Sequence, residues 1–162
     1  MKSYLLSAFV RTHAQLEEDM FRLSEPSCWL VWEAGPWKPG GARTLTAAPP
    51  RQPAPSVAPG VEALAYALAA KDGQQVTLGR GADCDIAIND GTISTQHLAF
   101  VRIDAVWMLA DSGSRNGSSL NGTPLVVGKP KPLMSSARIM AGSVAFSFYE
   151  PRDMLWRLKQ YR

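Results

Sequence analysis

Short β segments, each followed by a turn signal, fill the chain from residue 61 onward. Turn chemistry comes from Lys71-Asp72-Gly73, Asn89-Asp90-Gly91 and Asn121-Gly122. Many short strands with a turn roughly every 8–12 residues predict a mainly β fold, a sandwich or barrel of antiparallel strands. The predicted strands are Glu62–Leu68, Gln75–Gly79, Asp85–Ile88, His97–Ile103, Trp107–Ala110, Leu125–Val127, Ala137–Met140 and Ser143–Tyr149.

The N-terminal part of the chain has a helical pattern instead. Apolar residues recur at spacings of three and four over residues 4–24, which predicts one amphipathic helix that stops at Ser24-Glu25-Pro26. The stripe comprises Leu6, Phe9, Val10, His13, Leu16, Met20 and Leu23. Two interpretations stay open: the helix packs on its own domain, or it docks on a partner or dimerises.

Three of the five tryptophans lie in residues 27–40, where the alternation suits a short strand or an extended segment. Because this segment is too short to fold alone, it predicts either a small core or a surface that covers another element. Five prolines in residues 47–60 predict an extended linker. The predicted organisation is an N-terminal helix and Trp-rich segment (1–46), a Pro-rich linker (47–60), a β-sandwich (61–150) and a basic C-terminal tail or short helix (151–162).

Composition and charge exclude several classes of protein. With 46% hydrophobic residues, the chain can bury enough apolar surface to fold. The formal net charge of +3 equals the excess of residues 151–162, which contain four basic residues and one acidic residue. The body therefore has no concentrated basic face of the kind that binds nucleic acid. No apolar run approaches the ~18 residues of a membrane span.

Neither a metal centre nor a secretion signal is expected. Cys28, Cys84, His13 and His97 form no cluster in the sequence, which argues against a zinc site, and no other cofactor is expected. The N-terminal apolar run is short and ends at Arg11, unlike a signal peptide. The expected location is the cytoplasm, with both thiols reduced.

Three loops carry residues that suit the binding of an anion. Arg80 offers a planar fork of donors for a phosphate or carboxylate, and the Ser94 hydroxyl can donate to an anionic oxygen. Asn116 has both an amide donor and an acceptor, which suits gripping an extended peptide backbone. No nucleophile–base pair, magnesium-binding carboxylate cluster or Walker-type glycine loop accompanies them. The pattern predicts recognition without catalysis, so the protein is not expected to be an enzyme.

In their order along the chain, these motifs are similar to those of the forkhead-associated (FHA) domain, a β-sandwich that reads phosphothreonine. The matching motifs are Gly79-Arg80, Asp85-Ile86-Ala87-Ile88, Ser94-Thr95-Gln96-His97, Trp107, Asp111-Ser112-Gly113-Ser114-Arg115-Asn116-Gly117-Ser118 and Asn121-Gly122. One motif alone would be weak, but the ordered set at family spacing is specific. The resemblance covers residues 76–149, with 61–68 as the first strand, and says nothing about residues 1–59.

The resemblance implies a role for each matching residue. Arg80 and Ser94 are expected to contact the phosphate, and Asn116 is expected to hold the ligand backbone beside the phosphorylated residue. His97 is expected to brace the loop that carries Ser94. The full set of residues expected to support the site structurally is Gly79, His97, Ser114 and Gly117.

Two positions depart from the family pattern. Thr95 stands where the family has Arg or Lys, which removes one positive charge beside the phosphate, although its hydroxyl can still donate. Arg115 stands where the family often has a small hydroxyl residue, and we expect it to restore that charge from the neighbouring loop. Both residues are therefore included in the predicted phosphopeptide site.

The leading prediction is a signalling adaptor that binds phosphothreonine-containing proteins, the substrates of a Ser/Thr kinase. The alternative is an FHA-fold scaffold or assembly protein, for example in a bacterial secretion or regulatory complex, with weak or no phosphate dependence. In that case the N-terminal helix and the Trp-rich segment would form the working surface. A third hypothesis is self-regulation, in which phosphorylated Thr44 or Thr46 occupies the protein's own site.

Overall fold

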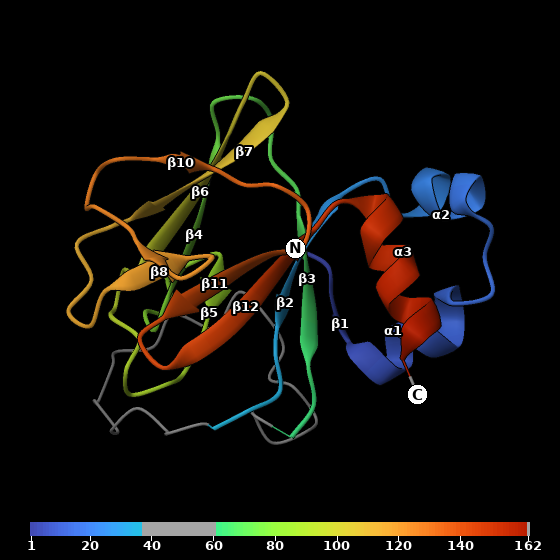
Figure 1. Ribbon diagram of the computed structural model, residues 1–162, viewed down its shortest axis with the longest axis horizontal. Coiled ribbons are helices and arrows are strands. Elements are labelled where there is room, and N and C mark those ends of the chain that lie inside the picture. The colour runs from blue at the N-terminus through green and yellow to red at the C-terminus, as the bar shows by residue number, and fades with distance from the viewer. Residues whose placement is uncertain (37–60, 162) are drawn as a thin grey trace.

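The computed structural model describes residues 1–36 and 61–161. In that part of the chain, two β-sheets face one another and a layer of helices covers the outer face of one sheet (Figure 1). The predicted proline-rich linker, Thr44 and Thr46 lie outside the described residues.

Seven strands form the larger sheet: β1 (Ser3–Leu5), β2 (Cys28–Trp32), β3 (Leu64–Leu68), β8 (Ser118–Leu120), β9 (Thr123–Pro124), β11 (Ala137–Ala141) and β12 (Val144–Tyr149). Their spatial order is β1-β3-β2-β12-β11-β8-β9. Five strands form the smaller sheet: β4 (Gln75–Gly79), β5 (Ile86–Ala87), β6 (Leu98–Ile103), β7 (Val106–Asp111) and β10 (Lys131–Pro132). Their order is β10-β7-β6-β4-β5.

Among these described strands, every pairing is antiparallel except that of β4 with β5. The predicted mainly β sandwich of short antiparallel strands is therefore confirmed. Large apolar side chains from both sheets fill the space between them, including Trp32, Phe100, Trp107, Ile139 and Phe146. Such burial of apolar area is the main favourable contribution to folding.

β2 lies inside the larger sheet, between β3 and β12. Leu30 and Trp32 face the core between the sheets, whereas Trp29 and Val31 face the helices. Because both faces of the strand are covered, successive residues are apolar and a simple alternation is lost. The Trp-rich segment is thus neither a separate core nor a cover. The sandwich begins before the predicted boundary at residue 61, and Glu62–Leu68 is not its first strand.

Two helices, α1 (Leu6–His13) and α2 (Glu18–Ser24), replace the single helix predicted over residues 4–24. Acidic residues Glu18 and Asp19 lie in the first turn of α2, where the helix dipole favours negative charge, so a new helix starts there. The turn between the helices rotates the apolar stripe. Phe21 is buried, while Met20 and Leu23 are 58% and 79% exposed, so the predicted stripe is wrong in α2.

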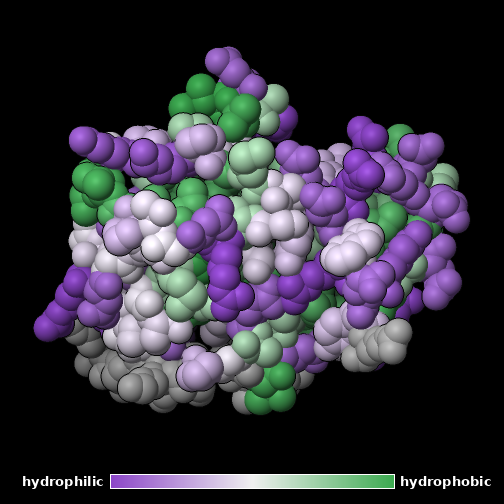
Figure 2. All heavy atoms as spheres, in the orientation of Figure 1, coloured by the Kyte–Doolittle hydropathy of each residue, from purple (hydrophilic) through white to green (hydrophobic). Residues whose placement is uncertain are grey.

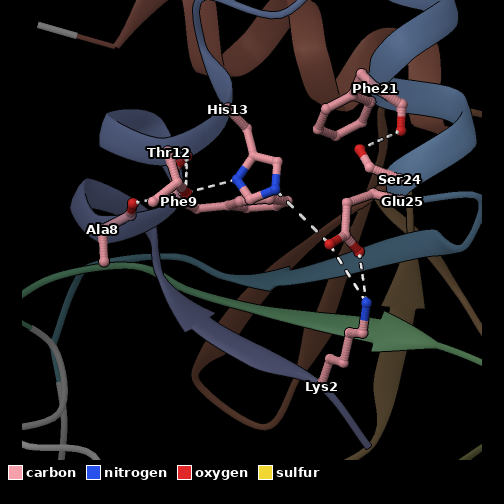
Figure 3. Close-up of polar contacts among 8 residues, drawn as sticks. All are labelled: Lys2, Ala8, Phe9, Thr12, His13, Phe21, Ser24 and Glu25. Carbon is pink, nitrogen blue, oxygen red and sulfur yellow. Dashed lines mark hydrogen bonds and ion pairs between the residues drawn. The ribbon is translucent and has the colours of Figure 1, made fainter.

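A buried carboxylate joins the N-terminal segments. Glu25, just after α2, is 5% exposed, and its two oxygens lie 3.4 Å from Lys2 Nζ (Figure 3). His13 Nε2, from the end of α1, lies 3.7 Å from Glu25 Oε1. Because an unpaired buried charge is costly, this cluster favours one arrangement of the two helices and the start of the chain.

The C-terminal helix α3 (Pro151–Gln160) confirms the predicted helix in this region and buries Met154, Leu155 and Leu158 against the other helices. Arg157 donates from Nη1 and Nη2 to the two carboxylate oxygens of Glu33, at 2.8 and 2.7 Å. The C-terminal segment is therefore a packed element of the fold. None of the described helices is long and apolar enough to cross a membrane.

Seven of the predicted strands coincide with observed ones, apart from their ends. The predicted strand Leu125–Val127 is wrong, because the strand of this region is β9 and it ends at Pro124. β8, β9 and β10 have two or three residues each, which is too short for a period-2 pattern to reveal them.

Candidate binding site

The three sequence loops meet at one end of the sandwich, where β4 ends, β6 begins and β7 leads into β8. Backbone hydrogen bonds join the first two loops. The Arg80 N–H donates to the Ser94 carbonyl at 2.8 Å, and the Gly81 N–H donates to the Thr95 carbonyl at 3.0 Å. A Cβ on Gly79 would lie 2.2 Å from the Thr95 oxygen, so only glycine allows the loops to approach this closely.

The third loop is tied to Ser94. The backbone N–H of Arg115 donates to Ser94 Oγ at 2.9 Å. Because the hydroxyl oxygen accepts this bond, its own hydrogen is left to donate to another group. Ser94 thus contacts the backbone of Arg80 through its carbonyl and the backbone of Arg115 through its hydroxyl.

His97 is fully buried and connects the loop that carries Ser94 to the loop that carries Gly117. Its Nδ1 accepts a hydrogen bond from the Ser94 N–H at 2.9 Å. Its Nε2 lies 3.1 Å from the Gly117 carbonyl and must donate, since a carbonyl only accepts. This is the neutral Nε2–H tautomer. Burial lowers the pKa of His97, which outweighs the opposing effects of Gly117 and Asp111 and keeps the ring uncharged.

Asp111 organises the β7–β8 loop. Its Oδ1 accepts from the N–H groups of Gly113 and Ser114, at 2.8 and 2.7 Å. Its Oδ2 accepts from the hydroxyls of Ser114 and Ser118, both at 2.6 Å. Burial would raise the pKa of Asp111, but these four hydrogen bonds to the charged form lower it below its usual value. The carboxylate therefore stays ionised and holds the loop that presents Asn116.

Asn116 is exposed, and one of its amide hydrogens is fixed. Its Nδ2 donates to the Thr92 carbonyl at 2.9 Å. The amide keeps Oδ1 as an acceptor and a second N–H as a donor. This donor–acceptor pair is the one that an extended peptide backbone can use.

Arginines supply the positive charge of the site. Arg80 is half-buried and Arg115 is exposed. Within residues 1–36 and 61–161, neither guanidinium makes a hydrogen bond or an ion pair to a side chain or carbonyl. The backbones of both arginines contact Ser94, so the two cationic residues belong to loops that meet at the same end of the sandwich, and the exposed Thr95 follows Ser94 in the chain.

The structure brings together all the residues predicted for the site, both the ligand-contacting set and the supporting set. Sequence reasoning missed the contacts that Asp111 and Thr92 make with these loops. The signal for Asp111 was available, because an aspartate at the start of a turn commonly accepts a hydrogen bond from the backbone two residues on. Among the described residues, no group of three or more His, Cys, Asp or Glu side chains could hold a metal ion.

Comparison with known protein families bears on the motifs of this site. A family model described as the FHA domain matches residues 76–142, fewer than half of the chain. These residues resemble an FHA domain. This confirms the resemblance carried by the sequence motifs, and FHA domains in general bind phosphothreonine peptides. No curated protein matches the chain.

Several solved FHA domains share the fold. The FHA domain of an Arabidopsis thaliana hypothetical protein is 27% identical, with a TM-score of 0.53, over 76% of this chain and 85% of that one. The FHA domain of the Chlamydia trachomatis CT664 protein is 18% identical, with a TM-score of 0.53, over 76% and 98%. The N-terminal FHA domain of Saccharomyces cerevisiae Rad53p is 17% identical, with a TM-score of 0.54, over 81% and 98%. These shares exceed residues 76–142, so the common fold extends to strands outside the family model.

Proposed function

We propose that this FHA-like domain binds phosphothreonine-containing proteins and acts as a non-enzymatic adaptor in Ser/Thr kinase signalling. The observation that carries the proposal is that Arg80 and Arg115 both contact Ser94 through their backbone N–H groups, while their guanidinium groups have no polar partner among the described residues. The general behaviour of the family supports it, as does the Rad53p domain, whose structure contains a phosphothreonine peptide.

The phosphate supplies most of the binding free energy in this proposal. It carries about −1.5 to −2 charges at neutral pH and has three acceptor oxygens. Arg80 donates from its planar fork, Ser94 donates its free hydroxyl hydrogen, and Arg115 adds the charge that Thr95 does not provide. Asn116 then pairs with the backbone next to the phosphorylated residue. An unphosphorylated peptide retains only this last contact.

The test is fluorescence polarisation with three degenerate peptide pools, carrying phosphothreonine, phosphoserine or unmodified threonine. We expect saturable binding of the phosphothreonine pool, weaker binding of the phosphoserine pool because one methyl group is worth roughly 1–3 kcal/mol, and no binding of the third. Arg80→Ala should weaken phosphothreonine binding by about 10–100-fold, since hydrogen bonds to charged groups are worth ~1.5–3 kcal/mol.

Arg138→Ala is the matched control for this experiment. Arg138 is exposed at the far end of β11 from the site, so its loss removes the same charge without touching the loops. Binding should be unchanged in this variant. Equal binding of all three pools, or equal binding by wild type and Arg80→Ala, would contradict the proposed function.

A second candidate function is the assembly scaffold, and one observation favours it. The helical layer exposes three apolar side chains, Met20, Leu23 and Trp156, the last at 66%. Figure 2 shows, on the right where the helices lie, a mostly hydrophilic surface with small hydrophobic areas. Deleting residues 1–46 cannot test this function, because β2 would be lost with them. The double variant Leu23→Ser/Trp156→Ser leaves the sheets intact. Loss of phosphate-independent partner capture in this variant, with Arg80→Ala unaffected, would favour the scaffold.

A cytoplasmic location, as expected from the sequence, forms part of the proposal. Cys28 and Cys84 are both free, and burial raises the pKa of each thiol, that of Cys28 to about 11. Both thiols are therefore protonated and unreactive at neutral pH.

A further inference from the structure

We propose that Thr92 is a positioning residue that sets the orientation of Asn116, and that the β11–β12 turn holds Thr92 in place. This inference rests on the proposed function, because it concerns how Asn116 grips the backbone of the ligand. The turn consists of Gly142 and Ser143, which are distant in sequence from the three loops of the FHA pattern.

Thr92 makes polar contacts with Asp90 and with Ser143, two with each. Its N–H and its hydroxyl both donate to Asp90 Oδ1, at 2.8 and 2.6 Å, and Asp90 is fully buried. Since the hydroxyl hydrogen goes to Asp90, the oxygen accepts from the turn. The Ser143 N–H and Ser143 Oγ each lie 3.0 Å from Thr92 Oγ1. Thr92 therefore links a buried carboxylate to the β11–β12 turn.

The carbonyl of Thr92 fixes which way the Asn116 amide points. A carbonyl accepts only, so it selects the NH₂ end of the side chain, and the 2.9 Å bond from Nδ2 holds that end. Oδ1 is then the end left for the N–H of a peptide. If Thr92 shifted, the amide could rotate, and the acceptor needed by the ligand would no longer be presented.

The β11–β12 turn fits against Thr92 only because it contains glycine. Gly142 has a φ of +55°, and a Cβ there would lie 2.5 Å from the Thr92 carbonyl oxygen. The Gly142 N–H also donates to the Gly117 carbonyl at 3.0 Å, the same oxygen that His97 Nε2 contacts. The turn thus supports two residues that adjoin Asn116: Thr92, whose carbonyl accepts from the Asn116 amide, and Gly117, which follows Asn116 in the chain.

Different residues bind the two parts of the ligand, its phosphate and its peptide backbone. The phosphate is held by Arg80 and Ser94, whereas the peptide backbone is held by Asn116. Loss of the Thr92 contacts should therefore weaken binding of a phosphothreonine peptide and leave binding of inorganic phosphate unchanged. A change that merely loosened the whole fold would weaken both.

Two variants with matched controls test this. Thr92→Val removes the hydroxyl contacts to Asp90 and Ser143, whereas Thr92→Ser keeps the hydroxyl and serves as the control. Gly142→Ala pushes against the Thr92 carbonyl, whereas Gly73→Ala imposes the same positive-φ penalty in the β3–β4 turn, where a Cβ meets nothing within 4 Å. Thermal unfolding by circular dichroism establishes that each variant is folded.

We expect Thr92→Val and Gly142→Ala to weaken phosphothreonine-peptide binding on the order of tenfold, as for the loss of one or two hydrogen bonds. Affinity for inorganic phosphate, measured by NMR titration, should be unchanged, and Thr92→Ser and Gly73→Ala should bind the peptide as wild type does. The Asn116 side-chain amide resonance should also move in Thr92→Val without ligand.

Three results would overturn the inference. Unchanged peptide affinity in both folded variants would show that Thr92 does not position Asn116. Equal weakening of peptide and phosphate would show a general structural effect. A wild-type protein that binds inorganic phosphate but not the phosphothreonine peptide would overturn both the inference and the proposed function. The first two results would overturn the inference alone.

Discussion

His97 and Asp111 lie beneath the binding loops and fix their geometry through hydrogen bonds. His97 is neutral, with Nδ1 accepting from the Ser94 loop and Nε2 donating to Gly117. A protonated ring would have two donors, and the Ser94 N–H would then face an N–H. The site therefore needs this histidine uncharged, and a buried environment provides that condition.

A pH dependence of stability follows. The pKa of His97 in the folded protein lies below its ordinary value of 6.5, so the unfolded chain binds more protons as the pH falls below about 6.5. The contribution of His97 is fully present above that pH and is lost as the pH falls through the folded pKa. Urea denaturation between pH 7.5 and 5 should show the free energy of unfolding falling with pH, less steeply in His97→Gln. The same slope in both proteins would contradict this account.

At the scale of elements, one side-chain pair adds to the apolar packing that holds α3 in place. Arg157 forms a bidentate pair with Glu33 and donates to Tyr149 Oη at 2.7 Å. The two charged side chains are 27% and 16% exposed, so the pair is better shielded than a surface ion pair. It ties the C-terminal helix to the residue that follows β2.

We predict that Arg157→Ala lowers the free energy of unfolding by about 1–3 kcal/mol, because Glu33 loses a charged partner in a half-buried setting. Arg152→Ala is the control: Arg152 is 78% exposed and its nitrogen lies 4.0 Å from Glu18, so the expected change is within ~0.5 kcal/mol. Urea denaturation of both variants measures the difference. Equal effects would mean that the Glu33 pair does not anchor α3.

Some of these elements could be predicted from the sequence and others could not. The strands from β4 to β7 are short apolar or alternating runs with turn residues between them, and these turn residues predict where each strand lies. β2 has two buried faces, and its partner β3 begins more than thirty residues later, so neither alternation nor proximity reveals the pairing. The break between α1 and α2 falls inside a continuous apolar spacing, and only packing decides that Phe21 turns inward.

The candidate site was more predictable than the fold around it. Arg80, Ser94, His97 and Asn116 follow from ordered motifs, because phosphate and backbone recognition require specific donors. Thr92 could not be found in this way. Its role depends on contacts with Asp90 and with the β11–β12 turn, about fifty residues away in sequence, and only the folded chain brings these together.

At the scale of the whole molecule, the helices are part of the FHA-like fold. Trp29, Val31, Ala65 and Ala67 on the larger sheet pack against apolar residues of α1, α2 and α3. The described N-terminal residues are therefore packed into the same folded unit as the sandwich. Any partner of the helical layer would meet a surface packed on the same sandwich that carries the loops of Arg80, Ser94 and Asn116.

Truncation tests this integration. A chain beginning at Val61 lacks β1 and β2, which leaves β3 and β12 without the strand between them and exposes Phe146 and Phe148. We expect no cooperative thermal transition by circular dichroism, in contrast to the full chain. A cooperative transition in the truncated chain would show that residues 61–162 fold independently.

The central claim is that the phosphothreonine ligand meets the loops around Arg80, Ser94 and Asn116. Backbone amide NMR of the full chain, titrated with one phosphothreonine peptide and its unphosphorylated form, tests this most directly. We predict phosphate-dependent shifts at residues 79–81, 92–97, 112–117 and 142–143, with the helices unmoved. Shifts confined to the helical layer, or identical shifts with both peptides, would contradict the account.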